Sequence, residues 1–336
     1  MATTGDMSVS ATKIPVSRMT VLEGDPQASV TQVTVAPDGA AAPPQPHRSN
    51  EAGQNEPTEL VIEPRRGWIA LNWNELFRSR ELLYFLIWRD IKVRYKQAVL
   101  GVAWAVLQPA SQMLVFTLIF GIAARMKQNL GVPYPIFVLS GLLPWQLFSA
   151  SLSTGGMSLV NQQHLLTKIY FPRLFIPTAV AGGALMDLAV GSVLFAGMMA
   201  AWGIAPGWGT VFLPLLLVLS LVMALGMSYL LAALTVTYRD FRFIIPVLTQ
   251  LWMWLSFVAF PPLLVANFRH KWLLAINPMF SIVAAYRKAL LGHKLTDAEI
   301  GWDWRYLSVS IATSLALFTL GLFYFRKTER RFADVA

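Results

Sequence analysis

The sequence predicts an all-α integral membrane protein with six transmembrane helices. Two features of its composition lead to this fold class. Of the 336 residues, 55% are hydrophobic and only 13% are charged, whereas about a quarter of the residues in a soluble domain are charged. The mean hydropathy is +0.52. The apolar residues also gather in long runs, and a run of about 20 residues is what a helix needs to cross a bilayer.

The composition also excludes several classes of function. The chain has no cysteine, so thiolate chemistry and Cys-type zinc sites are excluded. None of its four histidines is spaced with another as a metal-binding pair, and no metal is expected. The net charge of +9 would suggest nucleic acid binding in a soluble protein. Lys and Arg that flank membrane spans explain the same charge, so no nucleic acid partner is expected.

The first part of the chain divides into two predicted regions. Residues 1–62 are rich in Ala, Pro, Thr and Ser and show no helical apolar period, which predicts a disordered, uncleaved cytoplasmic tail. Residues 63–98 are predicted to form an amphipathic interface helix. Its basic residues make it too charged to span, so it is expected in the cytoplasmic headgroup layer. A soluble linker helix is the alternative.

Residues 99–336 contain six apolar stretches that are each predicted to span the membrane, because a helix satisfies its own backbone in lipid. Between the last two, Asn277-Pro278-Met279 and the apolar residues that follow predict a short outer or re-entrant helix that ends at Gly292. The inner flanks hold 16 Lys and Arg and the outer segments 8, which places both termini in the cytoplasm. The predicted spans are 99–124, 135–152, 174–202, 211–235, 244–265 and 307–325.

No catalytic motif occurs in the sequence, and an enzyme is not expected. A P-loop, a nucleophile elbow and an H-E-x-x-H motif are all missing, so ATP hydrolysis would need a separate subunit. Asp187 is an acidic residue in the middle of the third predicted span. A proton relay normally needs a second titratable site, so a structural or cavity-facing hydrogen bond is favoured. Ala181-Gly182-Gly183-Ala184 predicts close helix packing beside it.

Amide and aromatic side chains in the spans are candidates for lining a transport path. Gln108 and Gln112 are one turn apart and share a helix face that is unfavourable in lipid. Interhelical hydrogen bonds, a dimer interface and an interfacial tryptophan belt are the alternatives. The candidate pore-lining residues are Trp104, Gln108, Gln112, Tyr134, Trp145, Gln146, Trp252 and Trp254.

Four segments, in order along the chain, resemble the permease subunits of ABC-2-type polysaccharide exporters, and the resemblance covers about 65–330. They are Leu83 to Lys96 followed by Leu100-Gly101, Trp104 and Leu107-Gln108-Pro109; Lys168-Ile169-Tyr170-Phe171-Pro172-Arg173; Tyr238-Arg239-Asp240; and Asn277-Pro278-Met279 with Tyr286-Arg287.

The resemblance implies a homodimer in a bacterial inner membrane, with cytoplasmic ABC ATPase subunits that bind ATP and Mg. This chain itself is expected to hold no cofactor. In the family, the amphipathic helix and the loop between spans two and three contact the ATPase, and the short helices after span five flank the outer exit. Carried to this sequence, the ATPase-coupling residues are Arg89, Asp90, Lys92, Arg94, Asn161, His164, Leu165 and Lys168.

The leading hypothesis is ATP-driven export of a lipid-linked polysaccharide, such as the O-antigen of lipopolysaccharide, a capsular chain or a teichoic-type glycan. Arg89, Arg94 and Arg173 are candidates for binding the lipid diphosphate. One alternative is an ABC-2 exporter of drugs or small lipids. Others are a proton-coupled secondary transporter that uses Asp187 and a membrane-embedded glycan enzyme.

Overall fold

The computed structural model describes residues 77–96, 101, 103–123, 130–163, 171–261, 272–295 and 302–329. These residues form helices joined by turns, and none of them belongs to a strand. The predicted tail, 1–62, lies outside the described residues. So do His164, Leu165 and Lys168.

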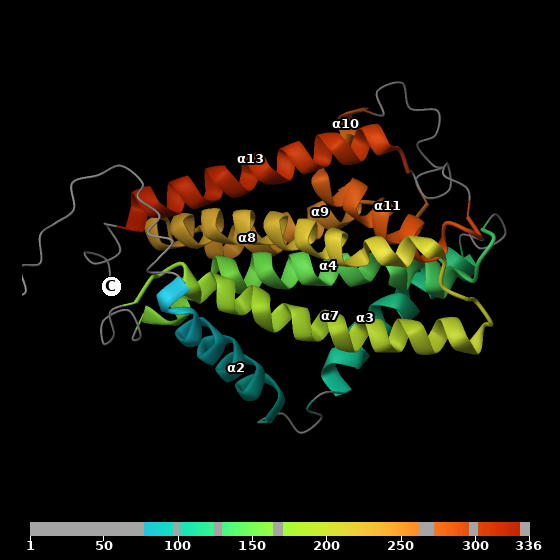
Figure 1. Ribbon diagram of the computed structural model, residues 1–336, viewed down its shortest axis with the longest axis horizontal. Coiled ribbons are helices and arrows are strands. Elements are labelled where there is room, and N and C mark those ends of the chain that lie inside the picture. Colours follow the sequence, from blue (N-terminus) through green and yellow to red (C-terminus); the bar gives the residue numbers. More distant parts are fainter. Residues whose placement is uncertain are drawn as a thin grey trace, which may run out of the picture. The chain divides into compact units, whose positions relative to one another are not determined.

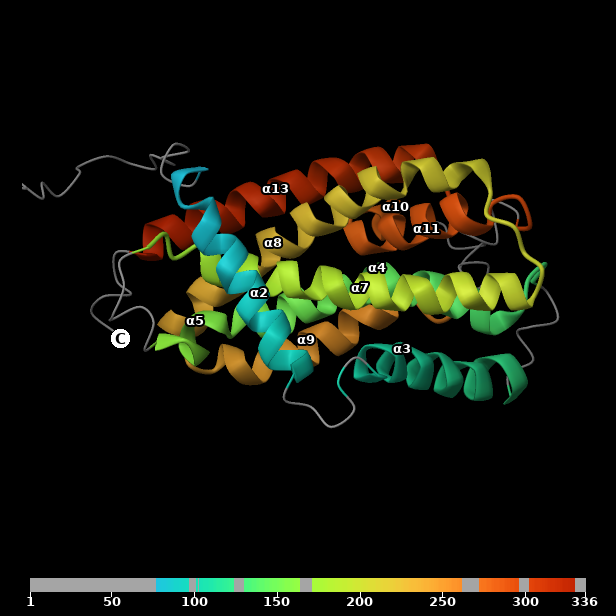
Figure 2. The same ribbon diagram turned by 60° about the horizontal axis from the view of Figure 1, so that its bottom comes forward.

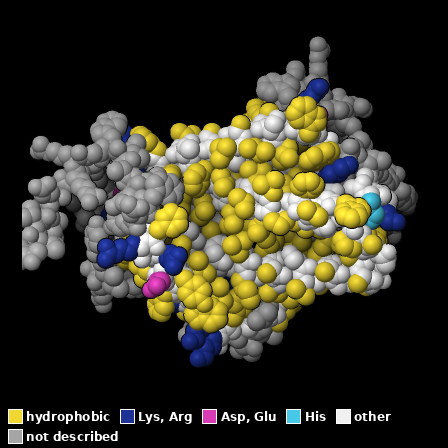
Figure 3. Space-filling model, viewed as in Figure 1, with side chains coloured by type: hydrophobic (Ala, Val, Ile, Leu, Met, Phe, Trp, Pro, Cys, Tyr) yellow, Lys and Arg dark blue, Asp and Glu magenta, His cyan; other side chains and the backbone are white. Residues whose placement is uncertain are grey.

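Five helices are long and apolar enough to cross a membrane, and they correspond to predicted spans one to four and six. The four longest, α4, α7, α8 and α13, run side by side (Figure 1). Hydrophobic side chains cover the middle of one face, and Lys and Arg lie toward its margins (Figure 3). The five are α3 (Ala103–Phe116) continued by the π-helix η1 (Thr117–Ala123), α4 (Tyr134–Gly156), α7 (Phe175–Ala201), α8 (Leu213–Thr237) after the 3₁₀ helix η3 (Trp208–Phe212), and α13 (Trp304–Glu329).

Helix α4 forms the centre of the described structure. It packs against α3, α7, α8, α9 and α11, and most of its residues are buried. Residues 136–145 are all buried, including Phe137, which is 0% exposed. Pro133 precedes the helix and Pro135 lies in its first turn, where the missing amide hydrogen has no helical partner to lose.

The α8–α13 pair depends on two glycines. A Cβ atom added to Gly321 of α13 would overlap the carbonyl oxygen of Gly226 of α8. A Cβ atom on Gly226 would lie 2.5 Å from the Cα atom of Phe318. The two backbones therefore approach as closely as small residues allow, which is how helices associate in lipid, where burial of apolar surface gives little driving force.

The predicted fifth span, 244–265, overlaps a helix of only 15 residues, α9 (Phe241–Leu255). At 1.5 Å per residue it is about 22 Å long, less than the roughly 30 Å of a bilayer core. The chain then turns through Phe257, which has a positive φ of 51°. That conformation is rare for a bulky side chain, so the surrounding structure must hold it.

The short helix predicted after Asn277 is confirmed. It is α11 (Pro278–Leu291), and it follows the four-residue helix α10 (Trp272–Ala275). Asn277 accepts a hydrogen bond from the Met279 amide, and Gly292 follows the last turn. Every residue of α11 except Lys288 is buried. Helix α11 packs against α4, α8, α13 and η3, so protein covers its backbone on several sides.

Helix α2 (Arg80–Lys96) lies across α7, and the short helix α5 (Ser158–Asn161) follows α4 (Figure 2). Helix α2 buries Leu86 against α7 but exposes Tyr84, Phe85 and Trp88. Apolar residues therefore lie on both of its faces. Its exposed aromatic side is open to a membrane surface or to a partner.

Gly321→Ala is expected to destabilise the protein by roughly 1–3 kcal/mol, because the added methyl forces α13 away from α8. Gly197→Ala in α7 is the matched control, since no atom of the described residues lies within 4 Å of a Cβ atom there. Thermal unfolding of the detergent-purified variants measures the difference. Equal melting temperatures would show that the two backbones are not in tight contact.

Candidate functional site

Helix α2 docks on α7 through an apolar contact. The side chain of Ile87 fills the space above Gly182, where a Cβ atom would lie 2.7 Å from it. Leu86 packs beside it against Phe175 and Ala179. The close packing predicted at residues 181–184 is therefore present, and its partner is α2.

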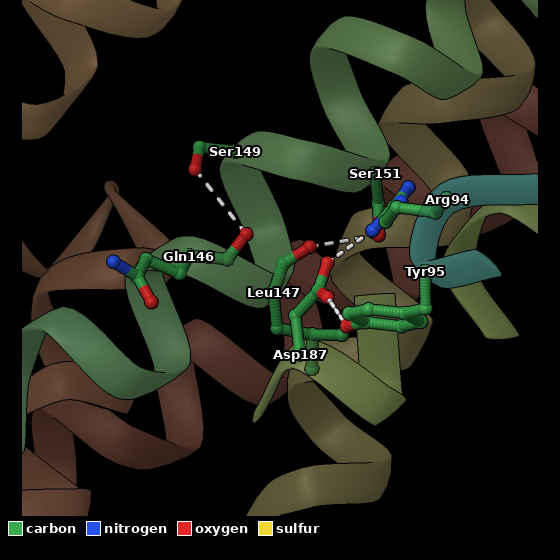
Figure 4. Close-up of polar contacts among 7 residues, drawn as sticks. All are labelled: Arg94, Tyr95, Gln146, Leu147, Ser149, Ser151 and Asp187. Atoms are coloured by element: carbon green, nitrogen blue, oxygen red, sulfur yellow. Dashed lines mark hydrogen bonds and ion pairs between the residues drawn. The ribbon is translucent and has the colours of Figure 1, made fainter. Parts of the chain in front are cut away.

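A polar contact binds the end of α2 to the same helix (Figure 4). Arg94 Nη1 and the Tyr95 hydroxyl donate to the two oxygens of the Asp187 carboxylate. Burial, and then the hydrogen bond to Asp187, raise the pKa of Tyr95, so the phenol stays a neutral donor. Asp187 has the hydrogen-bonded environment that the sequence favours, and its charged partner comes from α2.

The predicted ATPase-coupling residues are partly brought together. Arg89 bonds to Asp90 on its own helix, and its Nη2 also donates to Gln162 Oε1 at 2.9 Å. Gln162 directly follows α5, so this bond ties α2 to the loop after α4. Lys92 and Asn161 are both exposed. Their role in binding an ATPase remains a prediction.

The second half of α4 carries a polar face. After residues 136–145, which are buried, the side chains that reach the surface recur every three or four positions. Gln146 donates to Gln112 of α3 at 3.2 Å, which joins two of the predicted pore-lining residues. The exposed and half-buried residues of this face, which we call the α4 polar face, are Gln146, Ser149, Ala150, Ser153 and Thr154.

The exposed surfaces of the other long helices are mostly apolar, although Ser192 of α7 and Thr319 of α13 are also exposed. Val193 of α7 is 74% exposed, Leu215 of α8 is 67% exposed and Leu320 of α13 is 59% exposed. The exposed residues of the α4 polar face include no large apolar side chain. This contrast indicates that the polar face meets water, cargo or protein rather than lipid.

The remaining pore-lining candidates occupy different environments. Trp104 and Gln108 of α3 are exposed, which leaves them able to face a path. Tyr134 and Trp145 are 1% and 3% exposed and belong to the hydrophobic core of the chain. Both lie in the largely buried N-terminal half of α4, where its neighbours enclose them.

The two tryptophans of α9 interact with neighbouring side chains. Trp252 donates to the Asn277 side chain at 2.7 Å. Trp254 packs edge-on against Phe116 of α3, with the ring centroids 6.0 Å apart. These contacts give both indoles a structural role at the end of α9.

Residues 81–291, from the start of α2 to the end of α11, match the family model of the ABC-2 type transporter. The chain belongs to the ABC-2 type transporter family. The match includes both the docked α2 and the short helix α9 with the turn after it.

The chain is similar to three transport proteins. The O-antigen export system permease protein RfbA of Myxococcus xanthus is 36% identical over 227 residues, covering 67% of this chain and 86% of the relative. A protein of the same name from Klebsiella pneumoniae is 27% identical over 76% of this chain and 95% of the relative. The polysialic acid transport protein KpsM of Escherichia coli is 27% identical over 69% of this chain and 90% of the relative.

Arg287 of α11 is a residue whose buried environment the sequence did not predict. The sequence placed Arg287 among the Lys and Arg residues of the outer segments. In the structure its relative exposure is only 1%. Its Nη1 donates to the carbonyl of Phe257 at 3.0 Å, and its Nη2 donates to that of Val258. The guanidinium carbon lies 3.9 Å from the centroid of the Phe137 ring. The only hint in the sequence is its position within the otherwise apolar period of α11.

Asn277 acts on the same turn. Its Nδ2 donates to the Leu255 carbonyl at 3.1 Å and to Ser256 Oγ at 3.0 Å. The carbonyl end of a helix is negative and lacks intrahelical donors. Asn277, just before α11, and Arg287, in the second half of α11, therefore cap the end of α9 and the turn after it.

Arg287→Met is expected to destabilise the protein by roughly 2–4 kcal/mol, because two buried carbonyl oxygens lose their donors. Arg305→Met, at an exposed position in the first turn of α13, is the control and is expected to change stability little. Thermal unfolding in detergent compares the two variants. A similar small effect for both would contradict the capping role of Arg287.

Proposed function

We propose that this chain is the membrane-spanning permease subunit of an ATP-driven exporter that moves a lipid-linked polysaccharide across a bacterial inner membrane. The observation that carries the proposal is the family match over α2 to α11, together with relatives named as O-antigen and polysialic acid transporters. The same relatives favour a glycan cargo over drugs or small lipids. They are named as permease or transport proteins, which agrees with the lack of catalytic motifs.

In the proposed topology both termini are cytoplasmic. Helices α3, α4, α7, α8 and α13 cross the membrane. Helix α9 and the turn after it form a sixth, incomplete crossing, from which α11 folds back at the outer side. Support comes from the Lys and Arg distribution and from the caps on α9, which allow a helix to end at membrane depth.

The chain is proposed to act as a homodimer with a cytoplasmic ABC ATPase that binds ATP and Mg. Helix α2 and the segment after α5 would receive the movement of the ATPase, and the Arg89–Gln162 bond supports their acting together. A proton-coupled transporter is less favoured, because Asp187 is held by Arg94 and Tyr95 rather than facing a second titratable acid.

The cargo is proposed to pass along the α4 polar face. A sugar chain offers many hydroxyl groups, and amide and hydroxyl side chains can exchange hydrogen bonds with them. Gln108 and Gln112 of α3 would extend this face, and the exposed Trp104 would offer an aromatic surface. The same polar face on a second copy of the chain could complete the path.

A strain without this gene is expected to accumulate glycan inside the cell, and its surface polysaccharide should return only when the chain and its ATPase are both present. Immunoblotting of surface and internal glycan measures this. The purified chain alone should not hydrolyse ATP. Transport that survives ATP depletion, or drug sensitivity without glycan accumulation, would contradict the proposal.

The α4 polar face can be tested with single cysteines, because the chain contains no native cysteine. Ser149→Cys and Ser153→Cys should react with a water-soluble thiol reagent about tenfold faster than Val218→Cys of α8, because the reactive thiolate forms in water. Val218 is apolar and 55% exposed, which makes it the lipid-facing control. Equal rates would exclude a hydrated path here.

A further inference from the structure

The C-terminal end of α2 is bound to the middle of α7 by contacts that fix position. Arg94 and Tyr95 use both oxygens of the Asp187 carboxylate (Figure 4). The ion pairs Arg89–Asp90 and Arg326–Glu329, in contrast, each join residues of one helix. The Arg94–Asp187 pair links two helices whose residues are 93 positions apart in the chain.

The depth of this contact makes it important. Asp187 lies 12 residues beyond the first residue of α7, Phe175, which is about 18 Å along the helix. A charged side chain at such a position is costly unless a partner neutralises it. Arg94 is the ion-pair partner of this carboxylate, and Tyr95 supplies a second donor.

The polar contact and the apolar contact between α2 and α7 act differently. Ile87 against Gly182 gains stability from burial, which has no preferred direction and permits small sliding. Two hydrogen bonds to one carboxylate require defined directions, so they fix the register of α2 on α7. A shift of α2 along its axis therefore has to carry Asp187, and with it α7.

Helix α7 is the main route from α2 into the rest of the described structure. Helix α2 makes its extensive contacts with α7, and α7 packs along α4. Helix α4 carries the polar face proposed above for the cargo. A movement of α2 can thus reach the path through one intermediate helix.

We propose that Asp187 is a positioning residue that transmits movement of α2 to α7 during transport, acting through Arg94 and Tyr95. The inference rests on the proposed function and deepens it. It gives Arg94 an internal role within the permease, in place of the ATPase contact that the resemblance implies. Exposed residues of α2, such as Lys92 and Trp88, remain available to the ATPase.

The test uses the whole complex, permease with its ATPase, in liposomes loaded with lipid-linked glycan from the same cells. Export and ATP hydrolysis are measured together. The neutral double variant Arg94→Met/Asp187→Leu removes both charges at once, so it leaves neither one unpaired. Glycan exported per ATP hydrolysed is expected to fall about tenfold, within the usual range of coupling between sites.

The charge-swapped variant Arg94→Asp/Asp187→Arg restores an ion pair and is expected to recover most of the export per ATP. Glu329→Gln is the matched control, because it breaks an ion pair within α13 alone. A merely structural role would lower the amount of assembled complex but leave export per ATP unchanged, and that result would overturn the inference.

Two further outcomes are decisive. Failure of the swapped variant to recover export, despite normal assembly, would show that the acid itself is needed and would also overturn the inference. A wild-type complex that exports no glycan would refute the proposed function, and this inference with it. A wild-type complex that exports glycan beside a fully coupled neutral variant would refute this inference alone.

Discussion

Polar groups at membrane depth must find their partners within the protein, and this constraint organises the described structure. Its clearest expression is the end of α9. The helix stops at Leu255. The carbonyls of Leu255, Phe257 and Val258 receive donors from Asn277, just before α11, and from Arg287 within it. Helix α11 is in turn buried almost completely. The short helix α9 and the buried helix α11 are therefore held together by these bonds.

The same constraint explains two features elsewhere. Asp187 is stable in the middle of α7 because α2 reaches that depth and supplies Arg94 and Tyr95. Some polar groups of the α4 polar face have hydrogen-bond partners within the protein. Ser153 donates to the carbonyl of Ser149, and Gln146 donates to Gln112 of α3. The hydroxyl and amide groups of this face still lie at the surface, where lipid tails provide no hydrogen-bond partner. A protein that keeps such a face at membrane depth must hydrate it or cover it.

The sequence predicted the elements better than their contacts. Long apolar runs give five of the spans directly, because their length is set by bilayer thickness. The fifth was predicted too long, since composition does not distinguish an apolar span from an apolar turn, and Phe257, Val258 and Ala259 continue the run. The helix after Asn277 was predicted correctly from the helical spacing of its apolar residues and from Gly292 at its end.

Long-range pairs were beyond prediction from the sequence alone. Nothing local to Asp187 indicates an arginine 93 residues earlier, and nothing local to Arg287 indicates that it is buried. The Gly182 position was informative because a missing side chain requires a close neighbour, although the neighbour, Ile87, could not be named. For Tyr134 and Trp145 the residue type was misleading. An aromatic residue in a span can face either a transport path or the protein core, and the sequence does not distinguish the two.

The two ends of α4 are held in different ways, and this difference suggests where movement is allowed. At its N-terminal half, Phe137 packs under the Arg287 guanidinium, and Gly141 leaves room for Nη2, which would lie 2.6 Å from a Cβ atom there. That half is almost completely buried within the described structure and has little freedom to shift. The C-terminal half of α4 carries the polar face, and it lies beside the segment of α7 to which α2 is bound. A displacement entering through α2 would therefore change the polar face while the capped end of α9 stays fixed.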